Sequence, residues 1–135
     1  MASLDLGGRN LTVFPIPGHE GSHIAVYDPR MQVLLTGDML YPGLLTVQDW
    51  TAYRRSAARL AKFVQQKAVV LVLGNHIEMK KAPRDIYPIG TTFQPDEHVL
   101  PLSATHIEEL NTACEAMAHS PHVDVHDDFV IRPPG

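Results

Sequence analysis

The first third of the chain alternates short, mostly apolar segments with turn-forming residues. Residues 7–10 (GGRN) and 28–30 (DPR) are typical of tight hairpin turns. Pro15 and Pro17 place a strand end or a sheet edge near them, because proline donates no hydrogen bond to a sheet. This region therefore predicts an antiparallel meander. Its expected strands lie at 4–6, 11–16, 24–27 and 33–35.

Two later segments, at about 47–66 and 104–118, have the periodicity of amphipathic helices. Thr46 with Asp49 predicts a capping box at the start of the first, and Ser103 or Thr105 is expected to cap the second. Each helix is expected to present one apolar stripe to a sheet. The stripes are Trp50, Tyr53, Ala57, Leu60 and Val64 in the first helix, and Ile107, Leu110, Cys114 and Met117 in the second.

The segment 69–73 is apolar at every position, which predicts a strand that is buried on both faces. Residues 77–102 contain four prolines and predict a long ordered loop, whereas 123–131 predicts a final strand. The two helices can cover one face of a sheet of this size. We therefore expect another subunit to cover the other face.

Length and composition indicate a single domain, residues 1–135, because 44% of the 135 residues are hydrophobic and only 19% are charged. The net charge of -4 argues against a nucleic-acid surface, which needs clustered lysines and arginines. We expect a cytoplasmic protein without a membrane partner, since no secretory signal and no membrane-spanning apolar segment is evident. The single cysteine, Cys114, excludes a disulfide within the chain.

A histidine, an aspartate and a second histidine each follow a predicted strand with a glycine nearby. They are His19, Asp38 and His76, in the sequences PGH, TGD and GNH. Strand ends converge at one edge of a sheet, and imidazole and carboxylate are both zinc ligands. Each residue alone is more typical of an ordinary turn or surface loop, but their order around the first helix is more specific. The pattern predicts a divalent-metal site.

Segments 17–23 (PGHEGSH), 36–38 (TGD) and 74–76 (GNH) resemble the C-terminal half of a metallo-β-lactamase-fold hydrolase. The resemblance implies an α/β (α+β) fold that is half of an αββα sandwich, with a mostly antiparallel or mixed sheet and helices on one face. The H-x-H-x-D-H run that opens the family's metal site is absent from this chain. The expected architecture is therefore a truncated half-fold.

The resemblance also implies the metal ligands. His19 would bind a first metal, His76 a second, and Asp38 would bridge both at the catalytic position, with zinc or another divalent metal as cofactor. Three ligands do not complete a two-metal site, so low occupancy is expected in an isolated chain. A single metal that uses all three side chains is the alternative.

Tyr41, His23 and His98 are candidate substrate-binding residues because they lie near these motifs in the sequence. A solvated position is the alternative for His23, and a packed surface loop is the alternative for the segment that carries His98. Glu78 is a candidate to hydrogen-bond His76, with a surface salt bridge to a nearby lysine as the alternative. Solvated positions are expected for His106, His119, His122 and His126.

Two functions stay open. The first is a metal-dependent hydrolase for a small-molecule ester, lactone, thioester or lactam, incomplete or impaired as a single chain. The second is a non-catalytic homodimeric binding or structural module derived from the same fold. Both include a homodimer formed through the exposed sheet face, since a half-sandwich leaves more apolar surface than monomers usually tolerate.

Overall fold

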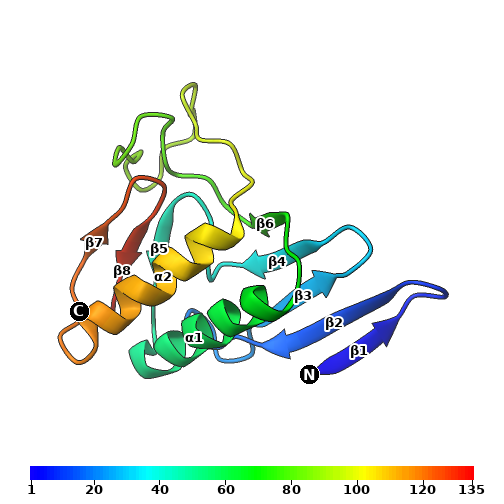
Figure 1. Ribbon diagram of the computed structural model, residues 1–135. Coiled ribbons are helices and arrows are strands. Elements are labelled where there is room, and N and C mark those ends of the chain that lie inside the picture. The colour runs from blue at the N-terminus through cyan, green and yellow to red at the C-terminus, as the bar shows by residue number, and fades with distance from the viewer.

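The computed structural model describes residues 1–135 as two sheets and two helices (Figure 1). The five-stranded sheet has the order β1-β2-β3-β4-β6, and the three-stranded sheet has the order β5-β8-β7. The predicted α/β class with a mixed sheet is confirmed. The elements are β1 Ala2–Asp5, β2 Asn10–Pro15, β3 Ile24–Asp28, β4 Val33–Gly37, β5 Leu44–Thr46, α1 Trp50–Gln66, β6 Leu71–Gly74, α2 Ala104–Met117, β7 Asp124–Val125 and β8 Val130–Arg132.

The predicted meander is present as β1 to β4, in which each strand pairs antiparallel with the next. The turn at 7–10 closes with a hydrogen bond from the Leu6 N–H to the Arg9 carbonyl. Pro15 is the last residue of β2, where a missing donor costs least. After α1, the chain returns to add β6 parallel to β4, which makes the sheet mixed.

Both helices lie on one face of the sheets, as predicted (Figure 1). Side chains of β4 alternate accordingly: Leu34 is buried beneath the helices, and the next residue, Leu35, is 44% exposed on the opposite face. Phe63 of α1 packs on Phe14 and Tyr27, with ring centroids 4.9 and 5.0 Å apart. These aromatic contacts join the first helix to the centre of the meander.

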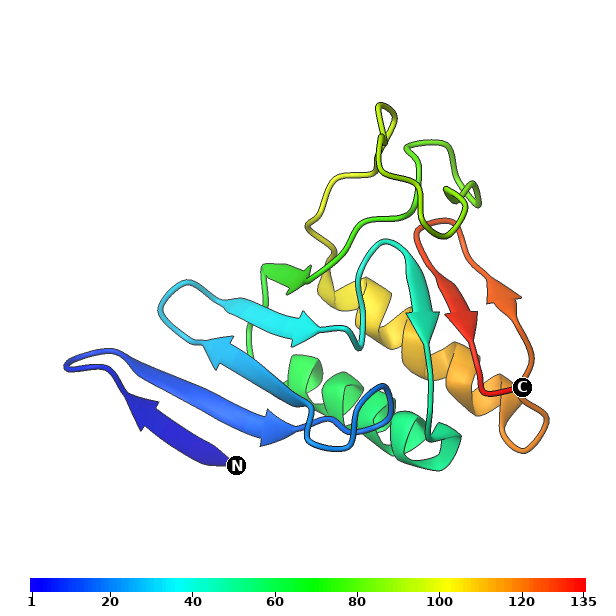
Figure 2. The same cartoon turned by 180° about the vertical axis from the view of Figure 1, so that it is seen from behind.

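No helix or strand covers the face of the five-stranded sheet that points away from the helices (Figure 2). This face carries exposed apolar side chains. Ile24, Leu35 and Leu71 on this face are each between 39% and 47% exposed. Within this chain, 69–73 is therefore not buried on both faces, and Val70 is also 57% exposed. That another subunit covers the open face stays a prediction. The strand begins only at Leu71, and one face lacks a second layer.

The first helix starts differently from the prediction. Asp49 is its N-cap and accepts a hydrogen bond from the Ala52 N–H at 3.0 Å. Thr46 lies instead in β5, a short strand that the sequence pattern did not reveal. The predicted capping box is wrong because Thr46 is part of β5, and residues 47–49, which end with the N-cap Asp49, separate that strand from the helix.

The second helix agrees with its prediction, with Ser103 as N-cap and its predicted apolar stripe buried. The final segment does not form one strand: it is a hairpin of β7 and β8, closed by a hydrogen bond from the His126 N–H to the Phe129 carbonyl. Residues 77–102 form the predicted long loop, with only isolated bridges such as Met79 to Ile86. Neither helix has the length and apolar character needed to cross a membrane.

Candidate active site

The parallel pairing of β4 and β6 brings Asp38 and His76 together. Gly37 and Gly74 are partners at the carboxyl ends of these strands, and the Asn75 N–H donates to the Gly37 carbonyl at 3.0 Å. The chain continues from both strands at the same sheet edge. As a result, His76 Nε2 lies 3.0 Å from Asp38 Oδ1.

His19 reaches the same point from the loop between β2 and β3. The Gly18 carbonyl accepts the N–H groups of residues 48 and 49, both at 2.9 Å, which ties this loop to the start of α1. His19 Nδ1 lies 2.8 Å from the Thr46 carbonyl, so this nitrogen carries the proton and donates. Nε2, the other ring nitrogen, lies 3.4 Å from Asp38 Oδ2.

Two glycines are sterically required for this geometry. Gly18 has φ +145°, and a Cβ there would lie 2.5 Å from the Tyr53 Cα. Gly37 has φ +55°, and a Cβ there would lie 2.2 Å from His23 Nε2. No larger residue fits without moving the histidine loop or the aspartate loop.

His23 contacts the backbone of the loop that carries Asp38, and it does not line the cavity on which Asp38 opens. Its Nε2 accepts the backbone N–H of Asp38 at 3.2 Å, and its buried Nδ1 has no hydrogen-bond partner. Burial lowers the pKa of His23 and outweighs the nearby Asp38 carboxylate, which would raise it. A neutral His23 is therefore part of the frame that holds Asp38, and its predicted contact with substrate stays a prediction.

The Asp38 carboxylate is incompletely satisfied. Its buried Oδ1 makes no hydrogen bond, although His76 Nε2 is only 3.0 Å away. An orphaned carboxylate oxygen between two imidazoles fits a divalent metal in the kind of donor atoms offered. The side chains are nevertheless not arranged as a metal-binding group, here or elsewhere in the chain.

Glu78, two residues after His76, lines the same cavity as the three strand-end residues. Its Oε1 accepts the Leu44 N–H at 2.9 Å, and its Oε2 lies 3.9 Å from His76 Nδ1. Lys80 pairs with Asp85 at 3.4 Å instead. Neither alternative for Glu78 is present: it forms no ion pair with Lys80, and 3.9 Å to His76 is longer than a hydrogen bond.

These side chains line a cavity of about 380 Å³. Tyr41 forms part of its wall, with its ring centroid 5.2 Å from that of His76 and its hydroxyl donating to the Leu44 carbonyl. Burial raises the pKa of Tyr41, so its hydroxyl stays protonated. The lining residues are His19, Asp38, Tyr41, Leu44, Thr46, His76, Glu78, Tyr87, Ile89 and Gly90.

His98 lies outside this cavity. Its Nε2 is 2.9 Å from Asp128 Oδ1, and Nε2 of His106 is 2.7 Å from Asp128 Oδ2. Burial would raise the pKa of Asp128, but the hydrogen bonds from His106 and His98 lower it overall. His98 thus joins the long loop to the β7–β8 hairpin, and its predicted role toward substrate stays a prediction.

His126 lies between two carboxylates, with Nδ1 2.8 Å from Glu109 Oε1 and Nε2 2.8 Å from Asp124 Oδ2. The prediction that His106 and His126 are solvated is therefore wrong, since Asp128 lies beside His106, and Glu109 and Asp124 lie beside His126. For His119 and His122, the same prediction is confirmed. We call the set of Asp128, His98, His106, His126, Glu109 and Asp124 the C-terminal cluster.

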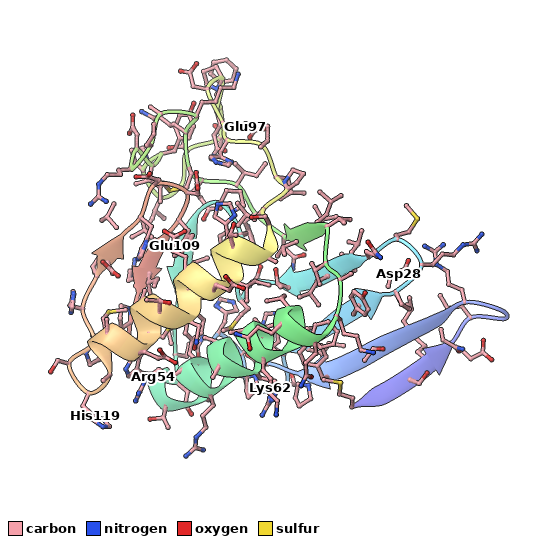
Figure 3. The ribbon with its side chains drawn as sticks, in the orientation of Figure 1. Asp28, Arg54, Lys62, Glu97, Glu109 and His119 are labelled. Atoms are coloured by element: carbon pink, nitrogen blue, oxygen red, sulfur yellow. The ribbon has the colours of Figure 1, made fainter.

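A second cavity, of about 420 Å³, lies between α1 and α2. Arg54 and His119 are both at its rim, near the start of α1 and the end of α2 (Figure 3). Burial raises the pKa of Cys114, which also lines it, to about 12, so the thiol is protonated. None of the three strand-end residues reaches this cavity, and we therefore assign the candidate active site to the smaller one.

The sequence profile of the metallo-beta-lactamase superfamily matches residues 2–76, which include all three strand-end residues. Acyl-coenzyme A thioesterase MBLAC2 of Gallus gallus is 32% identical over 96 residues, a match that covers 67% of this chain and 34% of that protein. The chain thus spans about a third of the length of the curated relatives that it matches.

Solved structures show the same fold. A metallo-beta-lactamase from Pontibacter korlensis aligns with a TM-score of 0.53 at 14% identity and covers 84% of this chain and 45% of that chain. An archaeal metallo-beta-lactamase superfamily protein from Sulfolobus tokodaii aligns at 0.51 and 17% identity, over 94% and 41%. With the profile match over more than half of its length, the chain belongs to the metallo-beta-lactamase superfamily.

Proposed function

We propose that this chain supplies His19, Asp38 and His76 as metal ligands of a hydrolase for esters, lactones, thioesters or lactams. The observation that carries the proposal is the buried Asp38 Oδ1, which makes no hydrogen bond. It belongs to a carboxylate that lies between the imidazoles of His19 and His76 and lines a cavity. Thioesters are the first substrates to test, because a chicken acyl-coenzyme A thioesterase matches 67% of the chain.

The three ligands are prepared to different degrees. His19 is fixed by the Thr46 carbonyl, which leaves its Nε2 free to bind. Asp38 is fixed through its backbone by His23. His76 is the most exposed, at 54% of its side chain, and the nearest carboxylate to its Nδ1 is Glu78 Oε2 at 3.9 Å. When bound, zinc or another divalent ion would supply Lewis-acid polarisation of the substrate carbonyl.

Three donors leave such a site incomplete, because the H-x-H-x-D-H run is absent from the chain. A homodimer is part of the proposal: a second copy would cover the apolar face that includes Ile24, Leu35 and Leu71. Burial of that face would supply the hydrophobic free energy that the half-sandwich lacks.

Native mass spectrometry after zinc exposure and dialysis tests this proposal, since it reports subunit number and bound metal together. We expect a zinc-loaded dimer that hydrolyses acyl thioesters, and a zinc-free dimer for the double variant His19→Ala/His76→Ala. A wild-type chain that retains no zinc, or retains as much as the double variant, overturns the proposal.

The second candidate function is a homodimeric binding or structural module without chemistry. The absence of a complete metal-binding group and the uncovered apolar face both favour it. In that case the dimer forms without zinc, and the double variant is indistinguishable from wild type in subunit number, stability and ligand binding.

A further inference from the structure

The candidate active-site cavity has a wall of distinct chemistry. Its ionisable side chains, apart from the tyrosines, come from the strand ends and from Glu78 just beyond β6. The mainly apolar part of the wall is formed by Leu44 of β5 and by Tyr87, Ile89 and Gly90 of the long loop. A volume of about 380 Å³ is within the range of small-molecule sites.

Ile89 is the most informative of these residues, because it is 78% exposed although it lines the cavity. Phe93, four residues further along the same loop, is also 78% exposed. A large aliphatic side chain left in water at the mouth of a polar site gains free energy only when something apolar covers it. Its position therefore points to the ligand, and not to the core.

The loop holds Ile89 in a defined place. The Thr91 N–H and Oγ1 both donate to the Pro88 carbonyl, at 3.1 and 2.6 Å, and close a turn with Ile89 at its tip. The Tyr87 hydroxyl accepts the Asp96 N–H at 2.7 Å, and the Tyr87 N–H donates to the Glu78 carbonyl at 2.8 Å. The apolar wall is thus formed before any ligand arrives.

From this arrangement we infer that the site takes substrates in which the reacting carbonyl carries an apolar chain of several carbons, not a small or polar group. The inference rests on the proposed function for the position of the carbonyl, near Asp38. The chain would lie along Leu44, Tyr87 and Ile89, and would cover the Ile89 side chain that is now in water.

The test measures binding without turnover. Octanamide and acetamide share a neutral carbonyl head group and differ only in chain length, so both are titrated into zinc-free wild-type chain and followed by amide NMR shifts. The variant Ile89→Ser removes the apolar tip. Val123→Ser is the matched control, because Val123 is also exposed, at 57%, and lies outside every cavity.

We expect octanamide to bind and shift amides of residues 86–91, acetamide to bind at least tenfold more weakly, and Ile89→Ser to weaken octanamide about tenfold. Val123→Ser should leave binding unchanged. Equal affinities for the two amides, no binding of either, or equal effects of the two variants overturn the inference. Octanamide binding to a chain that never retains zinc would support the inference while the proposed hydrolase fails.

Discussion

The candidate active site and the C-terminal cluster contain the same types of side chain, but differ in whether their polar atoms are hydrogen-bonded. In both, a carboxylate lies between two imidazoles: Asp38 between His19 and His76, and Asp128 between His98 and His106. Asp128 accepts hydrogen bonds at 2.9 and 2.7 Å through both oxygens. Asp38 makes none through its buried Oδ1.

This difference indicates that the C-terminal cluster is structural, whereas the group around Asp38 is a candidate functional site. The C-terminal cluster joins the long loop, α2 and the β7–β8 hairpin, and its polar groups are satisfied by one another. The site cluster, by which we mean His19, Asp38 and His76, lines a cavity and contains a carboxylate oxygen without a hydrogen bond. Such an oxygen costs free energy unless a ligand binds there. Residue types alone do not distinguish the two, whereas hydrogen-bond satisfaction does.

The largest expected effect comes from Gly18→Ala, which disturbs the loop that positions His19. A Cβ at Gly18 meets the backbone of Tyr53 at 2.5 Å in a conformation with positive φ. We expect about 3 kcal/mol or more of lost stability, measured by urea unfolding. Gly21→Ala is the control, because nothing lies within 4 Å of a Cβ there. A Gly18→Ala chain as stable as the control would refute this account of the loop.

Asp128→Asn tests the C-terminal cluster as a structural element. The substitution weakens two hydrogen bonds to imidazoles, so we expect about 2 kcal/mol of destabilisation in urea unfolding. Zinc affinity should not change, since Asp128 lines no cavity. The neighbouring exposed residue provides the control Asp127→Asn, which should leave stability within about 0.5 kcal/mol of wild type.

Asp38→Asn should show the opposite pattern. We expect a change in stability below about 1 kcal/mol, because the buried oxygen that it alters makes no hydrogen bond in the first place. Zinc binding should fall at least tenfold, by analogy with the cost of losing groups that merely orient a ligand. If Asp38→Asn instead destabilises the chain as much as Asp128→Asn, the contrast between the two clusters fails.

The smallest expected effect is on pH dependence. The folded-state pKa of Asp128 lies below its ordinary value of 3.8. Its stabilising contribution is therefore complete above that ordinary value and is lost as pH falls through the lower folded pKa. Urea midpoints measured from about pH 5 down to about pH 2 should fall more steeply for wild type than for Asp128→Asn. Parallel curves for the two chains would show that the carboxylate is not selectively stabilised.

The site was more predictable than the histidines outside it, for a physical reason. Asp38 and His76 follow two strands that are parallel neighbours in the sheet, and His19 follows a position where the backbone geometry allows only glycine. Glycines beside strand ends are visible in the local sequence. His106 and His126 carry no such local mark. Asp128, the partner of His106, lies 22 residues away, and Glu109, one partner of His126, lies 17 residues away. Asp124, the other partner of His126, is only two residues away, but its side chain points to the histidine because the two residues lie in the β7–β8 hairpin.

The same distinction explains the fold. The meander and both helices follow from alternation and periodicity, which are local properties. Strand β5, only three residues long, forms because it pairs with β8 more than eighty residues later, and no local pattern reveals that. The segment 69–73 looked doubly buried because it is uniformly apolar. The chain covers only one of its faces.

The most direct test of the central claim is calorimetric titration of zinc into wild type, Asp38→Asn and Asp128→Asn, side by side. The account predicts that wild type and Asp128→Asn bind zinc with equal affinity, and that Asp38→Asn binds at least tenfold more weakly. Equal binding by all three chains, or loss of binding in Asp128→Asn alone, would contradict the assignment of the metal-ligand cluster to His19, Asp38 and His76.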